Sequence, residues 1–117
     1  MPIIHSYTDH QNYLYRFNYL FGISEVFKSL PAAIQTKEVE LVVKMTKDGV
    51  PNIRFQALLV LLQFAQLLED KTVEERARKV ADGLLGDSDG EVRRLAKAIA
   101  ATKELKSIVE KEPEFGE

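Results

Sequence analysis

The chain has 117 residues, of which 45% are hydrophobic and 29% are charged, a composition typical of a soluble globular protein and not of a disordered one. Its 16 basic and 18 acidic residues give a net charge of −2, so the chain as a whole does not attract nucleic acid or an anionic membrane. It contains no cysteine, which excludes disulfides, thiolate catalysis and cysteine-ligated zinc and permits a reducing compartment. We expect no secretory signal and no membrane span, because the longest apolar run, residues 57–64, is far shorter than the roughly 20 residues that a span needs.

Two helices are expected in the N-terminal part. Residues 1–9 have the pattern of the end of a helix whose start is missing. Asn12 can cap the next helix, which we expect to run to about Lys28, before the break at Pro31. Its broad apolar face contains Tyr13, Leu14, Phe17, Leu20, Phe21, Val26 and Phe27, and core packing is the favoured role of these aromatic rings. Gly22 lowers the helix propensity there, which indicates that a neighbouring element approaches it closely.

Two more helices are expected on either side of residues 48–50. Thr36 can cap a helix over residues 37–47. Asp48-Gly49 is expected to end it, because glycine tolerates backbone angles that few other residues reach. Pro51 fits the first turn of the following helix, which we expect to end at Leu68. That helix is apolar almost all the way round, and a helix apolar on most sides is buried on most sides, so we expect it to be the middle helix of a stack.

A further helix is expected after residue 70. Thr72 and Glu75 have the spacing of a capping box, so we expect a helix to about Leu85, with Gly86 as its C-terminal stop. No sustained alternation of apolar and polar residues is found anywhere in the chain, which excludes a strand prediction. The sequence therefore predicts an all-α protein.

The last helix is expected to be more polar. Ser88 and Glu91 repeat the capping-box spacing, and we expect the helix to continue to about Val109. Its charged side chains are typical of a terminal repeat whose outer face meets water. Residues 111–117 are expected to form a frayed tail.

One seven-residue pattern occurs twice in the chain. Asp48-Gly49-Val50-Pro51-Asn52-Ile53-Arg54 returns 39 residues later as Asp87-Ser88-Asp89-Gly90-Glu91-Val92-Arg93, and a degraded copy occupies residues 10–16. A period near 40 residues with a helix on either side of each turn is the signature of a HEAT-type repeat. We therefore expect an α-α superhelix (a HEAT/ARM-like solenoid) of about two and a half antiparallel helix pairs. Its single domain, residues 1–117, divides into a partial repeat (1–30), a full repeat (31–69), a terminal capping repeat (70–110) and the tail.

The aspartate and arginine of each turn are expected to be structural. We expect them to bond between adjacent repeats and to form a ladder along the solenoid, with Asp48 paired with Arg54 and Asp87 paired with Arg93. The residues between them would project from the ridge of turns and carry the function, since a repeat array binds partners through its turns and one exposed face.

Catalytic and metal-binding patterns are not found. His5 and His10 are five residues apart, which is not the i, i+4 spacing of a helical metal pair. Asp87 and Asp89 resemble the start of a calcium loop, but the twelfth position is Ala98 and not a glutamate. Phosphate-binding loops and nucleophile elbows are also missing. We therefore predict a non-enzymatic protein with no catalytic residues, no metal and no cofactor.

Several stretches resemble one family of HEAT-repeat proteins. They are residues 12–16, 20–21, 24–26, 36–37 and 48–55, with Asn-Tyr-Leu-x-Arg and Asn-Ile-Arg-Phe as the most specific words, and residues 87–93 less specifically. They resemble the C-terminal repeats of the scaffolding A subunit of protein phosphatase 2A, over residues 3–102 and without large gaps. The resemblance implies a cytoplasmic or nuclear phosphatase regulator whose intra-repeat turns hold the phosphatase catalytic subunit.

This leading hypothesis assigns partner contacts to two turns. They are Tyr13, Tyr15 and Arg16 on the first turn, and Val50, Pro51, Asn52 and Arg54 on the second, because aromatic and arginine side chains are frequent interface hot spots. A HEAT-repeat adaptor for another protein is an alternative. A nucleic-acid-binding HEAT protein is a further one, based on the basic side chains of Arg76, Arg78, Lys79, Arg93, Arg94 and Lys97, although interleaved acids favour an ion-paired solvated face.

The N-terminal edge of the array is expected to be exposed. A solenoid normally covers its terminal repeats with polar faces, whereas the first full helix here is apolar and its upstream neighbour is stunted. We therefore expect self-association through the N-terminal apolar face, or residues 1–11 folded over it.

Overall fold

Helix α4, Pro51–Leu68, is the centre of the structure, a computed structural model in which residues 13–103, 105 and 108 are described. Its buried side chains are Ile53, Ala57, Leu58, Leu59, Val60, Leu61, Leu62, Phe64 and Ala65. It packs against α2 (Tyr13–Val26), α3 (Ala32–Met45), α5 (Lys71–Gly83) and α6 (Gly90–Ala101). The prediction that this helix is buried on most sides is confirmed, because neighbours from both layers of the structure cover it.

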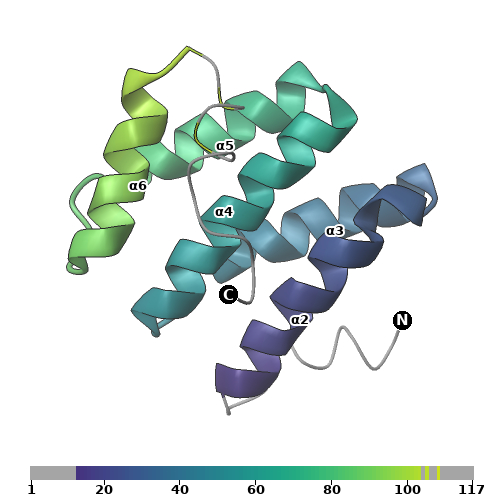
Figure 1. Cartoon of the computed structure of the whole chain (residues 1–117), viewed down its shortest axis with the longest axis horizontal. Helices are drawn as coiled ribbons and strands as arrows, with labels where there is room; N and C mark the ends of the chain where they lie inside the picture. The colour runs from purple at the N-terminus through teal and green to yellow at the C-terminus, as the bar shows by residue number, and fades with distance from the viewer. Residues whose placement is uncertain (1–12, 104, 106–107, 109–117) are drawn as a thin grey trace.

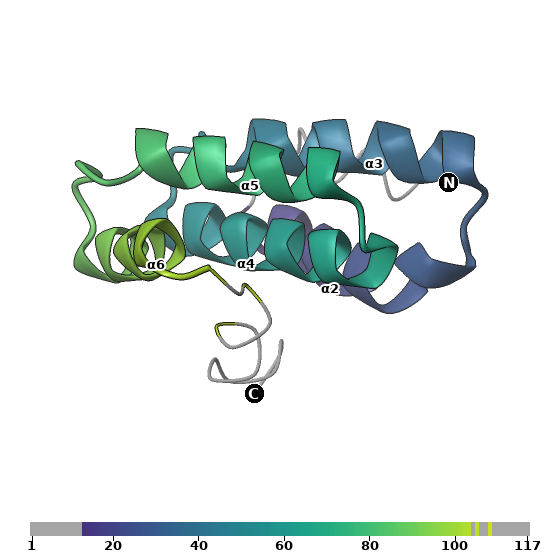
Figure 2. The same ribbon diagram turned by 90° about the horizontal axis from the view of Figure 1, so that it is seen from above.

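The helices form two layers. Figure 2 shows α2, α4 and α6 side by side in one layer and α3 with α5 in the other. Each helix packs on the next one along the chain from α3 onwards, and α4 also packs on α2 and α6 within its own layer. The α2, α4 and α6 helices therefore begin along one edge of the molecule, at the lower left of Figure 1. None of the described residues lies in a strand, so the all-α class is confirmed.

The core joins α2 firmly to its neighbours. The 3₁₀ turn Phe27–Ser29 that follows α2 places the ring of Phe27 against that of Phe64, stacked with centroids 3.7 Å apart. Across the layers, the buried Tyr19 hydroxyl donates a hydrogen bond to the buried carboxylate of Glu38 on α3. Burial and the Glu38 carboxylate both raise the pKa of Tyr19 above its usual 10.0, so this phenol stays protonated in the folded protein.

The start of α3 differs from the sequence prediction. The helix begins at Ala32, after Pro31, and not at residue 37. Thr36 therefore lies inside the helix, where its hydroxyl hydrogen-bonds the Ala32 carbonyl oxygen at 3.2 Å. Pro31 explains the difference, because its fixed φ and missing N–H suit the position just before a helix, and threonine in a helix can satisfy its hydroxyl within the preceding turn.

The caps of the last two helices are also shifted. Helix α5 is capped by Asp70, whose carboxylate accepts from the Thr72 backbone N–H at 2.8 Å, and not by Thr72. Helix α6 is capped by Asp89, whose Oδ2 accepts from two backbone N–H groups at 3.0 Å, and not by Ser88. In both cases an aspartate next to the predicted cap occupies the capping position, as its strong N-cap preference and its charge at the positive helix end allow.

The helix ends correct three further expectations. No described glycine has a φ in the left-handed range, so neither Gly49 nor Gly86 uses that conformation. The left-handed residue is instead Glu69, with φ 49° at the end of α4. A Cβ atom added at Gly22 would meet no neighbouring atom within 4 Å, so no element approaches this glycine closely.

Helix α6 ends earlier than predicted. Its last residue is Ala101, and Thr102 is extended with ψ 150°, although Leu105 and Ile108 beyond it are buried. The expectations for residues 1–12, for Val109 and for the tail lie outside the described residues. Among the described helices, none combines the length and apolarity needed to cross a membrane.

Candidate partner-binding ridge

The two copies of the repeated pattern form turns along one edge of the molecule. We call this edge the turn ridge; it comprises residues 46–50 and 84–89 with the first turns of α2, α4 and α6 (Figure 1). Each turn is fixed by its first aspartate, whose Oδ1 accepts the backbone N–H two residues on. These bonds are 2.8 Å from Val50 to Asp48 and 2.9 Å from Asp89 to Asp87. Such local bonds are the reason why aspartate favours turns.

Arginine side chains connect successive turns. Arg16 donates from Nε and Nη2 to the two carboxylate oxygens of Asp48, at 2.6 and 3.1 Å. One repeat further on, Arg54 donates from Nε and Nη2 to Asp87, at 2.8 and 2.7 Å. Both contacts are two-point guanidinium–carboxylate pairs, the strongest form of charged hydrogen bonding between side chains.

The pairs named from the sequence meet differently. Arg54 Nη1 donates to the backbone carbonyl oxygen of Asp48 at 2.9 Å, and Arg93 Nη1 donates to that of Asp87 at 2.7 Å. The aspartate carboxylate of each turn is instead bound by the arginine of the preceding turn. The expected ladder between repeats is thus present, and it includes Arg16, which the sequence reasoning assigned to partner binding.

The ladder is shielded from solvent. The side chains of Arg16 and Asp48 are 13% and 11% exposed, and those of Arg54 and Asp87 are 12% and 8% exposed. The hydrogen bonds from Arg54 hold the pKa of Asp87 below its usual 3.8, and the same contact raises the pKa of Arg54. Both groups are therefore charged at neutral pH, and their screening by salt is reduced.

The ladder decides which predicted contact residues are accessible. Arg16 and Arg54 are largely occupied by it. Tyr15 is 40% exposed and Asn52 is exposed, while the side chains of Val50 and Pro51 are half-buried; the side chain of Tyr13 lies outside the described part.

A cavity of about 300 Å³ opens between two of the helix starts. Its lining residues are Pro51, Asn52, Phe55 and Gln56 from α4, with Asp89 and Glu91 from the next turn. Sequence reasoning named the first two as contact residues and missed the other four. Phe55 and Gln56 follow Asn52 by one helical turn and share its face, a signal that could have found them. Asp89 and Glu91 join the cavity only because α6 packs beside α4.

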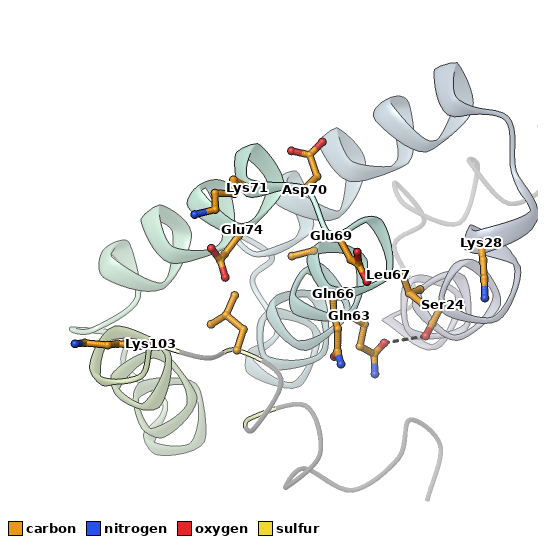
Figure 3. Close-up of a pocket in the computed structure, with 12 residues that line it drawn as sticks. Ser24, Lys28, Gln63, Gln66, Leu67, Glu69, Asp70, Lys71, Glu74 and Lys103 are labelled. Carbon is orange, nitrogen blue, oxygen red and sulfur yellow. Dashed lines mark hydrogen bonds between the residues drawn. The ribbon is translucent and has the colours of Figure 1, made fainter.

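A larger cavity, of about 940 Å³, lies at the opposite end of α4 (Figure 3). It is lined by Ser24, Lys28, Gln63, Ala65, Gln66, Leu67, Glu69, Asp70, Lys71, Glu74, Lys103 and Leu105. Ser24 donates to Gln63 Oε1 at 2.9 Å. Its lysines and acids are equal in number, so the lining favours neither sign of ligand charge, and no pattern in the sequence indicated this cavity.

Residues for metal chemistry are not gathered in either place. Within residues 13–103, 105 and 108, no three His, Asp or Glu side chains are placed to hold a metal ion. His5 and His10 lie outside this part of the chain.

The basic side chains of α5 and α6 are mostly engaged within the protein. Arg76 pairs with Glu40, and Arg94 pairs with Glu91 at 3.1 Å. Arg78 donates to three backbone carbonyl oxygens at the end of α6, those of Ile99, Thr102 and Lys103, at 2.7 to 3.1 Å. With Arg93 bound to the turn, four of the six cations have internal acceptors, which leaves Lys79 and Lys97 as the cations for which the described residues supply no such bond.

Comparison with known proteins does not place the chain in a family. No protein-family model matches it, and neither a curated protein nor a solved structure is significantly similar to it.

Proposed function

We propose that the chain is a non-enzymatic HEAT-type scaffold that binds a protein partner along the turn ridge. The observation that carries this proposal is the repetition of one bonding scheme. In each copy of the turn, an aspartate binds the backbone two residues on, accepts a guanidinium from the preceding repeat, and receives an arginine from its own repeat at its carbonyl oxygen. Structural units that repeat in this way stack into an array, and such arrays serve as extended binding surfaces.

The partner that we propose is a protein phosphatase catalytic subunit. The sequence resemblance to the phosphatase 2A scaffold supports this choice. The accessible part of the turn ridge also has suitable chemistry, because Tyr15, Pro51 and Asn52 combine apolar area with hydrogen-bonding groups, as interface residues do.

The test is binding of purified phosphatase 2A catalytic subunit to the immobilised chain. We expect Tyr15→Ala with Asn52→Ala to weaken binding by about tenfold or more, since each hot-spot truncation costs over ~1 kcal/mol. The matched control is Glu75→Ala with Lys79→Ala, two exposed positions on α5 in the other layer, which should leave binding unchanged.

Three results would be informative in different ways. Failure of the unmodified chain to bind would exclude the phosphatase and leave a HEAT-type adaptor for another protein. Binding that survives the ridge substitutions would exclude the ridge. Binding of duplex DNA with a steep salt dependence would instead favour the nucleic-acid alternative.

A further inference from the structure

The small cavity on the turn ridge has one-sided chemistry. Its six lining residues include two carboxylates and two carboxamides, and no positively charged side chain is among them. The remaining two, Pro51 and Phe55, add apolar surface. A volume of about 300 Å³ is at the lower limit for small-molecule sites and suits one long side chain.

Several acceptor atoms at this cavity have no donor. Gln56 Oε1 is buried and accepts no hydrogen bond, which is unfavourable for a polar atom removed from water. Asp89 uses Oδ2 to cap α6, and Glu91 uses Oε2 to bind Arg94. Among the described residues, no bond is made to Asp89 Oδ1 or Glu91 Oε1. A ligand with several N–H donors would satisfy all three groups.

The chain itself shows how a guanidinium sits at the rim. Arg94 places its guanidinium carbon 5.8 Å from the centroid of the Phe55 ring while its Nε donates to Glu91. This combination of a ring and a carboxylate is the usual environment of a bound arginine. The Arg94 side chain is 48% exposed, so its position can be vacated at small cost.

We propose that this cavity binds an arginine side chain of the protein partner. The aliphatic stem lies on Pro51 and Phe55, and the guanidinium donates to Asp89, Glu91 and the Gln56 carbonyl oxygen. Arginine fits better than lysine because its planar head presents five donors and stacks on an aromatic ring. The identity of the ligand as part of a protein partner rests on the proposed function; the chemistry of the cavity does not.

The probe for this proposal is the peptide acetyl-Gly-Arg-Gly-amide, titrated into ¹⁵N-labelled chain and followed by NMR. We expect millimolar binding, with the largest shifts at the Asn52 backbone, the Gln56 side-chain amide and the Glu91 backbone. The matched peptide with citrulline, which has the same shape without the charge, should bind about fivefold more weakly or worse. Shifts of equal size with citrulline or with the lysine peptide, or no shifts around the cavity, would overturn the proposal.

Substitutions of opposite effect sharpen the test. Glu91→Gln should weaken peptide binding about fivefold, because it removes a carboxylate without changing the shape of the cavity. Arg94→Gln should strengthen it severalfold, because it removes the internal competitor for Glu91 and Phe55. The control Glu75→Gln, on the exposed face of α5, should change nothing. An unchanged affinity in both Glu91→Gln and Arg94→Gln would contradict the proposed site. Because these titrations contain no phosphatase, their failure is distinguishable from failure of the scaffold to bind it.

Discussion

At the scale of single residues, Arg54 connects two turns that are 39 positions apart in their patterns. Its guanidinium donates to both carboxylate oxygens of Asp87 and to the carbonyl oxygens of Asp48 and Gly49. A lysine could not reproduce these contacts, because its ammonium is a point donor and not a planar fork. The direction of the ladder thus follows from arginine geometry, with one edge of the fork facing the next repeat and the other facing its own turn.

Replacing Arg54 by methionine should therefore strongly destabilise the protein. The Asp87 carboxylate and two carbonyl oxygens would lose their donor while remaining mostly shielded, and we expect a loss of about 2–4 kcal/mol in the free energy of unfolding. Arg76→Met is the matched control, because the Arg76–Glu40 pair is 39% and 55% exposed and should contribute less than about 1 kcal/mol. Urea denaturation followed by circular dichroism measures both. Equal losses in the two variants would refute a special role for the ladder.

The ladder also predicts how stability depends on acid. The pKa of Asp87 is lowered in the folded state by Arg54, so folding favours the ionised carboxylate. The corresponding stabilisation is present above the ordinary pKa of 3.8 and is lost as the pH falls from there through the lower folded pKa. Asp87→Asn should therefore be less stable than the wild type at neutral pH, and the difference should shrink below pH 3.8. A difference that stays constant through acid unfolding would contradict this assignment.

At the scale of helices, the sequence was informative where one physical effect dominated. The burial of α4 could be predicted, because nearly all its side chains are apolar and only a helix surrounded by neighbours tolerates that. The helix starts could not, because proline, threonine and aspartate lie within a few residues of one another and compete for the cap. At α5 and α6 the capping residues, Asp70 and Asp89, are selected by the path of the preceding turn, which only the packed structure fixes.

Gly22 gives a direct test at this scale. It lies within α2, and a Cβ added there would meet no atom within 4 Å. Gly22→Ala should therefore stabilise the protein by about 0.5–1 kcal/mol, since alanine restricts the unfolded chain and has the higher helix propensity. Gly90→Ala is a useful comparison, because Gly90 is the first residue of α6, where propensity matters less, and its change in melting temperature should be smaller. A destabilised Gly22→Ala protein would show that a neighbouring element does crowd this position.

At the scale of the whole molecule, the repeat was readable from the sequence and the site only in part. The period of 39 residues located both turns, and the turn ridge followed from them. The cavity did not follow, because its lining comes from two successive repeats and depends on how α4 and α6 lie beside each other (Figure 1). The arginine ladder was mispaired for the same reason: spacing within one turn gives the residues, whereas the distance between turns decides the partners.

The edge of the array at α2 leads to the last prediction. Leu14, Tyr15 and Val26 on this helix are 53%, 40% and 38% exposed, and within the described part of the chain α2 has a layer neighbour, α4, on one side only. Apolar surface of this kind favours association. We expect the chain to self-associate at high concentration in sedimentation experiments, and Leu14→Glu to lower the association constant about tenfold or more, since burial of one leucine contributes on the order of 1–2 kcal/mol. Leu85→Glu is the matched control, because Leu85 is 37% exposed but lies in the turn between α5 and α6. A monomer at all concentrations would exclude self-association and leave residues 1–11 as the cover of this face. Should those residues also exchange their amide protons as a disordered segment does, both expectations for this edge would be wrong.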